Sequence, residues 1–218
     1  MLNIQVFTVN MLMENCYVVW DSSLEAVIID CGACYAEERA SIAKFIKDAG
    51  LKVVRLLCTH GHFDHIMGDE FVFEQYGVKP ELNGADLRLY NQCNEQFMDF
   101  LGEKVSLKLP AVDSFLDEGD EVEFGSHVFR VLSTPGHTPG GISYYCKEEA
   151  IVFSGDSIFR HSIGRTDFTY GDSELLMRKL KENILTLPND TRIMPGHGHP
   201  STVGEEKVDN PFFAGMYN

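Results

Sequence analysis

The sequence predicts an α/β fold in which two stacked β-layers are covered by helices on both outer faces. Three observations lead to this prediction. β-rich runs precede an amphipathic helix in the first half of the chain, the second half repeats this order, and no low-complexity linker divides the halves. The 218 residues are long for one domain and short for two, so we expect a single domain over residues 1–218.

The first half opens with three β-rich runs, at residues 4–9, 16–20 and 25–30, and turn-like polar residues between them predict an antiparallel meander. Residues 37–50 (EERASIAKFIKDAG) place apolar side chains at helical spacing before a glycine, which predicts an amphipathic helix with a glycine stop. Residues 51–59 (LKVVRLLCT) form a nearly continuous apolar run, typical of a strand buried on both faces.

The second half repeats the pattern. We expect two strands around a Gly-Ser turn in residues 120–134, two more at 141–146 and 150–156, a helix over 173–187 and a short strand at 191–194. Between the halves, residues 85–102 carry aromatic side chains at helix-like spacing. We interpret this segment as core packing rather than as a cap over a substrate pocket.

A cluster of histidines begins where the strand of residues 51–59 ends. Residues 59–69 read THGHFDHIMGD, in a chain with only eight histidines. His60 and His62 alternate in a segment that leaves a strand, so both can project to one side, whereas Asp64 and His65 follow at a turn into a helix. Two groups of ligands that point differently can serve two metal ions.

Three further candidate ligands, His137, Asp156 and His197, each follow a predicted strand beside Gly or Pro. Open α/β sheets bind ligands at the carboxyl ends of their strands, so these residues are expected to converge with the cluster. A solvated surface turn would explain the cluster alone, but not the three additional strand ends. Five imidazoles and two carboxylates suit two zinc-like divalent ions, with iron or manganese as alternatives and an aspartate able to bridge.

In this order the motifs resemble those of the metallo-β-lactamase superfamily, whose H-x-H-x-D-H signature is matched by residues 60–65. The resemblance continues through residues 134–141, 154–168 and 195–212, and it implies a four-layer αββα sandwich. It also implies a ligand set for each ion: His60, His62 and His137 for one, Asp64, His65 and His197 for the other, with Asp156 as the bridge.

Within that superfamily, GRTDF at 164–168 and GEEKVDNPF at 204–212 resemble the short, single-domain glyoxalase II-like (hydroxyacylglutathione hydrolase-like) enzymes. Two-domain glyoxalase II enzymes carry a C-terminal helical domain that helps to hold glutathione. This chain stops six residues after Phe212, so the use of glutathione stays open.

The resemblance implies a dinuclear hydrolase of thioesters such as S-acylglutathione-like compounds, in which a metal-bridging hydroxide attacks the carbonyl carbon. A leaving thiol with a parent pKa of ~8.5 needs no dedicated general acid. Asp64 is expected to be a ligand that also orients the nucleophile. The alternatives are a mononuclear iron enzyme similar to the persulfide dioxygenases, and a hydrolase of lactones, phosphodiesters or β-lactams. A metal-binding protein without activity is a further, weaker alternative.

Other residues near these motifs are expected to support the site. Thr59, Asp30 and Thr134 are candidates to fix imidazole tautomers, with a turn or helix cap as the alternative for each. Arg165 and Asp167 are expected to form an ion pair that braces a loop, and Arg160 and His161 to face a substrate carboxylate. The remaining histidines, His127 and His199, are interpreted as strand or surface residues.

Net charge and the absence of targeting signals limit the classes of partner that we expect the protein to bind. A formal net charge of −15 argues against a nucleic-acid surface. No stretch approaches the ~20 apolar residues of a membrane span, and the start lacks a signal peptide, so we expect a cytoplasmic protein with a small-molecule thioester substrate. Oligomeric state stays open. Cys31 and Cys34 have C-x-x-C spacing, but we expect a turn with free thiols rather than a redox or metal pair.

Overall fold

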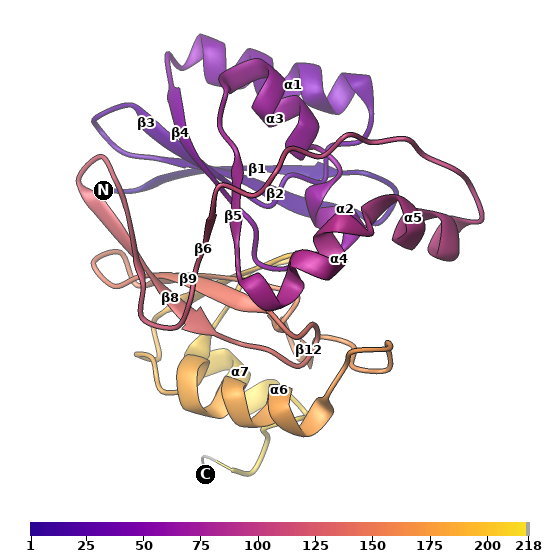
Figure 1. Ribbon diagram of the computed structural model, residues 1–218. Helices are drawn as coiled ribbons and strands as arrows, with labels where there is room; N and C mark the ends of the chain where they lie inside the picture. The colour runs from indigo at the N-terminus through magenta and orange to yellow at the C-terminus, as the bar shows by residue number, and fades with distance from the viewer. Residues whose placement is uncertain (217–218) are drawn as a thin grey trace.

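The computed structural model describes residues 1–216, which form two six-stranded sheets and a small hairpin (Figure 1). The first sheet contains, in spatial order, β1 (Asn3–Val9), β2 (Glu14–Trp20), β3 (Glu25–Ile29), β4 (Lys52–Leu57), β5 (Pro80–Leu82) and β6 (Ser114–Phe115). The second contains β14 (Ser201–Thr202), β13 (Arg192–Pro195), β10 (Ile151–Gly155), β9 (Ile142–Cys146), β8 (His127–Ser133) and β7 (Glu121–Phe124). The hairpin pairs β11 (Ile158–Phe159) with β12 (Ser162–Ile163).

The helices lie outside the two sheets, so the layers follow the order α, β, β, α (Figure 1). α1 (Ala36–Asp48) and α3 (Asp69–Tyr76) cover the first sheet, and α6 (Ser173–Lys179) and α7 (Val203–Asp209) cover the second. Three short helices lie to one side: α2 (Phe63–Ile66), α4 (Leu87–Asn91) and α5 (Cys93–Leu101). The predicted α/β sandwich with helices on both outer faces is confirmed.

Side-chain alternation along β2 explains the layering. Tyr17 and Val19 point into the core between the sheets, whereas Cys16 and Val18 pack under the helices of the first sheet. Both faces of β2 are covered, and accordingly the strand is apolar from Cys16 to Trp20, after the buried polar residues Glu14 and Asn15. Between the sheets, Tyr17 meets Phe153 of β10 edge to face, with the ring centroids 5.1 Å apart.

Several elements differ from the sequence prediction. β4 is not buried on both faces along its whole length, because Lys52 is exposed and the half-buried Arg55 makes an ion pair with Glu81 at 3.0 Å. The helix expected over 173–187 ends as α6 at Lys179 and continues as a π-helical turn, Leu180–Ile184. Segment 85–102, whose aromatic residues have helix-like spacing, forms three short helical pieces.

The interpretation of residues 85–102 as core packing is correct for part of the segment. Tyr90 and Phe97 are buried in one apolar cluster, whereas Phe100 is 51% exposed. Within residues 1–216, no helix combines the length and the apolar character that crossing a bilayer requires.

Tyr17 links the inter-sheet core to the end of β13, because its buried hydroxyl donates to the carbonyl of Pro195 at 2.6 Å. Asn15 Nδ2 also donates to this carbonyl, at 3.1 Å, so the acceptor keeps one partner if the hydroxyl is lost. We expect Tyr17→Phe to lower the free energy of unfolding by about 1 kcal/mol, measured by urea titration. Tyr170→Phe, at an exposed tyrosine, is the matched control. Equal stability of the two variants would contradict this prediction.

Candidate metal centre

Four loops meet at one edge of the sandwich, and each follows the end of a strand. The loop after β4 carries His60 and His62 and leads into α2, which holds Asp64 and His65. The loops after β8, β10 and β13 carry His137, Asp156 and His197. The structure therefore brings together all seven residues proposed as metal ligands.

The first ligand group contains His60, His62 and His137, whose candidate donor atoms all lie within 4.8 Å of one another. His62 Nδ1 lies 2.9 Å from His137 Nε2. The His60 ring centroid lies 4.9 Å from that of His62 and 5.1 Å from that of His137. Three imidazoles thus converge on one point.

The second ligand group contains Asp64, His65 and His197, again with donor atoms within 4.8 Å. Asp64 Oδ2 lies 3.3 Å from His197 Nε2 and 3.8 Å from His65 Nε2. The two groups are neighbours, because the rings of His60 and His65 have centroids 4.2 Å apart.

Asp156 lies between the two groups. Its Oδ1 is 3.4 Å from His65 Nε2, and its Oδ2 is 3.6 Å from both His137 Nε2 and His197 Nε2. One carboxylate therefore faces ligands of both groups, as a bridging residue must.

Three atoms of this centre test whether it fits metal ions. His60 Nε2, His65 Nε2 and Asp156 Oδ1 are buried and have no hydrogen-bond partner. Native proteins rarely leave buried polar atoms unpaired, because each costs about 1–3 kcal/mol. Divalent ions that bind nitrogen and oxygen would satisfy all three atoms, so the donor set fits.

Four ligand histidines are held through Nδ1, so Nε2 is the ring nitrogen that faces the centre. Nδ1 of His60 donates to Thr59 Oγ1 at 3.0 Å, and Nδ1 of His65 to Asp30 Oδ2 at 2.9 Å. Nδ1 of His137 donates to the Arg165 carbonyl at 2.6 Å, and Nδ1 of His197 to the Leu12 carbonyl at 3.1 Å. Such partners fix the tautomer and ring orientation of metal-ligating histidines.

Electrostatics differ between the groups. Burial and the nearby His137 lower the pKa of His62 to about 3, and burial with the neighbouring imidazoles also lowers the pKa of His60. Both rings are therefore neutral at pH 7, as metal ligation requires. In the second group, burial opposes charge on His65, but Asp156, Asp64 and Asp30 outweigh it and raise its pKa. These carboxylates favour positive charge, and a divalent ion would take the place of that proton.

Asp30 is the main support of the ligands. It is buried and has a φ of +50°. It accepts hydrogen bonds from Thr59 N and Thr59 Oγ1, both at 2.7 Å, in addition to the one from His65. Through Thr59 it also fixes His60, so one carboxylate orients a ligand of each group. Thr134 is placed differently, because its hydroxyl contacts Ser143 and Ser157, and no contact with an imidazole is seen in the described residues.

The charged and histidine side chains of segment 160–167 are exposed. Arg165 and Asp167 form the expected ion pair, at 2.8 Å, although it is the Arg165 carbonyl that reaches a ligand histidine. Arg160 and His161 both contact Glu205, at 2.9 and 3.2 Å, and their role toward a substrate carboxylate stays a prediction. Cys31 and Cys34 are free thiols in the loop before α1.

Two residues that hold the ligand loops in place were not predicted from the sequence. The buried carboxylate of Asp86 accepts from Gly61 N at 2.9 Å and from Gly140 N at 2.6 Å, and so ties the His60 loop to the His137 loop. Asn15 holds the His197 loop, with its backbone N–H on the Gly196 carbonyl at 2.7 Å. A single Asp or Asn carries no motif, so no sequence signal marked either residue.

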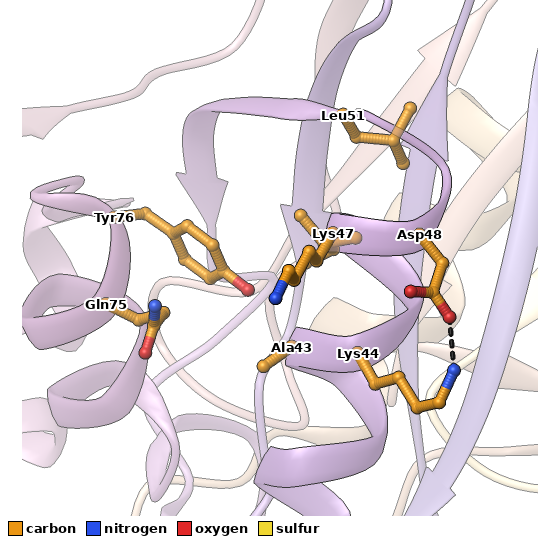
Figure 2. Close-up of a pocket in the computed structure, with 8 residues that line it drawn as sticks. Ala43, Lys44, Lys47, Asp48, Leu51, Gln75 and Tyr76 are labelled. Atoms are coloured by element: carbon orange, nitrogen blue, oxygen red, sulfur yellow. Dashed lines mark hydrogen bonds and ion pairs between the residues drawn. The ribbon is translucent and has the colours of Figure 1, made fainter.

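A separate hollow of about 530 Å³ lies between α1 and α3 (Figure 2). Its lining contains no histidine, and its one carboxylate, on Asp48, is bound by Lys44. It therefore lacks the imidazoles of the histidine cluster, and its carboxylate is already paired.

Comparison with known proteins agrees with this geometry. The family model described as the metallo-beta-lactamase superfamily matches residues 9–197. The hydroxyacylglutathione hydrolase GloC of Haemophilus influenzae is 35% identical, covering 97% of this chain and 98% of its own. Among solved structures, the BLEG-1 B3 metallo-beta-lactamase superposes with a TM-score of 0.89 at 32% identity, covering 98% of this chain and 100% of its own. TTHA1623, solved in a di-iron-bound form, has a TM-score of 0.84 at 36% identity, with coverage of 95% and 99%.

A family match over most of the chain, a full-length relative and a shared fold all agree with a centre built from histidine and aspartate side chains. The chain is a member of the metallo-β-lactamase superfamily of metal-dependent hydrolases.

Proposed function

We propose that the protein hydrolyses thioesters of the S-acylglutathione type at a dinuclear metal site. The observation that carries this proposal is the pair of ligand groups joined by Asp156, which faces His65, His137 and His197 at once. The full-length similarity to a hydroxyacylglutathione hydrolase supports a thioester as the substrate.

The residues of the centre would have distinct roles in binding metal and in orienting the nucleophile. His60, His62 and His137 would hold one ion, Asp64, His65 and His197 the other, and Asp156 both. When bound, such ions supply a Lewis acid and a nucleophilic hydroxide at neutral pH. Asp64 stays charged, because His65 and His197 outweigh the effect of burial and lower its pKa, so it can accept a hydrogen bond and orient the nucleophile. A thiolate leaving group with a parent pKa of ~8.5 departs without a general acid.

We take zinc as the first choice of metal, with iron or manganese as alternatives, because all seven donors are imidazole nitrogens or carboxylate oxygens. The similar protein TTHA1623 was solved in a di-iron-bound form, which supports iron as an alternative metal. The six cysteines are all free, which supports a cytoplasmic location, where thiols stay reduced.

Metal content and turnover test the proposal together. We expect protein purified anaerobically, without added metal, to carry about two equivalents of zinc or of a zinc and iron mixture. We also expect it to hydrolyse S-acyl thioesters faster than lactones, phosphodiesters or β-lactams, and to lose that activity on chelation. One iron per chain, with oxygen consumed in the presence of persulfides, would instead make it an oxidoreductase and refute the proposal.

A further inference from the structure

The loop of residues 164–172 borders the first ligand group and is packed tightly at both ends. Gly164 N donates to the Ser157 carbonyl at 3.1 Å, and Asp172 N donates to the Gly136 carbonyl at 2.7 Å. A Cβ added to Gly164 would clash with the carbonyl of Asp156. The position of the loop relative to the metal centre is therefore well defined.

Phe168, on this loop, stands beside two ligand imidazoles. Its ring centroid lies 5.5 Å from that of His62 and 5.9 Å from that of His137, both in edge-to-face geometry. The side chain is 37% exposed and belongs to none of the apolar core clusters found in the described residues. Its ring therefore offers an apolar surface to a ligand that binds beside His62 and His137.

The ring is also held in place. The Arg165 guanidinium lies over it, 4.5 Å from the centroid, and is itself fixed by two hydrogen bonds to Asp167, at 2.9 and 2.8 Å. A side chain restrained before binding loses less conformational entropy when a ligand contacts it. The ion pair also offsets the charge of Arg165, so the guanidinium that lies over the Phe168 ring is already paired with a carboxylate. An aromatic surface of this kind suits an uncharged apolar group better than a thiol that carries carboxylates.

We propose that Phe168 is a specificity-determining residue that contacts the acyl group of the substrate and favours apolar acyl chains. This inference rests on the proposed thioester hydrolysis. A tenfold preference for the longer chain corresponds to about 1.4 kcal/mol, which the burial of about two methylenes against one ring supplies.

The kinetic test compares acetyl and octanoyl thioesters of the same thiol. We expect Phe168→Ala to lower the octanoyl-to-acetyl ratio of kcat/KM about 10-fold. Phe168→Leu should keep most of the preference. Phe115→Ala, at a phenylalanine that is 52% exposed on β6, is the matched control and should leave the ratio unchanged. Metal content is measured for each variant, so that loss of an ion is not mistaken for loss of selectivity.

A binding test separates this inference from the proposed function. Non-hydrolysable isosteres, in which CH2 replaces the thioester sulfur, are titrated by calorimetry with acetyl-length and octanoyl-length chains. We expect the wild type to bind the octanoyl isostere about 10-fold more tightly and Phe168→Ala to lose this preference. Thioester turnover with an unchanged preference in Phe168→Ala would overturn the role of Phe168. Altered selectivity among thiols instead of acyl chains would overturn the assignment to the acyl group. Chain-length preference in binding without any thioester turnover would overturn the proposed function alone.

Discussion

Replacing Asp156 with asparagine is expected to lower kcat/KM by about a thousandfold or more, equivalent to about 4 kcal/mol of transition-state stabilisation. Asn is nearly isosteric with Asp, so the change removes charge rather than volume. In the wild type, burial raises the pKa of Asp156, but the neighbouring His65, His197 and His137 outweigh it and keep the carboxylate charged. A neutral amide cannot bridge two cations, so the variant should hold fewer than two metal ions per chain.

The control for Asp156→Asn is Asp48→Asn, an exposed carboxylate on α1 that pairs with Lys44 far from the histidine cluster. We expect this variant to keep wild-type metal content and activity, because exposed ion pairs contribute about 1 kcal/mol or less to stability. Circular dichroism spectra that match the wild type would show that both variants fold. Wild-type activity with two bound ions in Asp156→Asn would contradict the assignment of Asp156 as the bridge.

The sequence predicts the elements with strong periodic signals. β2, β3, β9 and β10 are largely apolar runs that are buried at nearly every position, and α1 is an amphipathic helix of three to four turns. The strands β5, β6 and β14 are only two or three residues long, too short for any periodicity. They exist because each pairs with a strand already in its sheet.

The ligands could be predicted because five of the seven are histidines, of which the chain has eight, and because all seven lie in segments that follow strands. Most of the groups that orient these ligands could not be predicted. His137 and His197 are oriented by backbone carbonyls, of Arg165 and Leu12, and any residue type supplies a carbonyl. The sequence predicts a role for the Arg165 side chain near the site, whereas in the structure its backbone carbonyl holds a ligand histidine. Thr134 has the expected position but other partners, because Ser143 and Ser157 lie closer to its hydroxyl.

Asp30 and Thr59 are exceptions, supporting residues that their places at strand ends made predictable, and the loss of Asp30 should affect both ligand groups. We expect Asp30→Asn to weaken metal affinity about 10- to 100-fold, measured by competition with a chromophoric chelator. One amide offers a single acceptor oxygen, so it cannot serve Thr59 N, Thr59 Oγ1 and His65 Nδ1 together. Asn tolerates the positive φ of +50° at this position, so backbone strain does not confound the result.

Thr59→Val separates the two effects of Asp30. Val keeps the shape of Thr but removes the hydroxyl that joins Asp30 to His60, whereas His65 keeps its direct hydrogen bond to Asp30. Of the two hydrogen bonds that the Thr59 hydroxyl makes, the one to His60 orients the ligand, and its loss costs about 1 kcal/mol, so the ion held by His60 should weaken about fivefold while the other stays bound. Asp30→Asn should weaken both ions. If Thr59→Val weakened both ions as much as Asp30→Asn, Thr59 rather than Asp30 would be the residue that couples the two ligand groups.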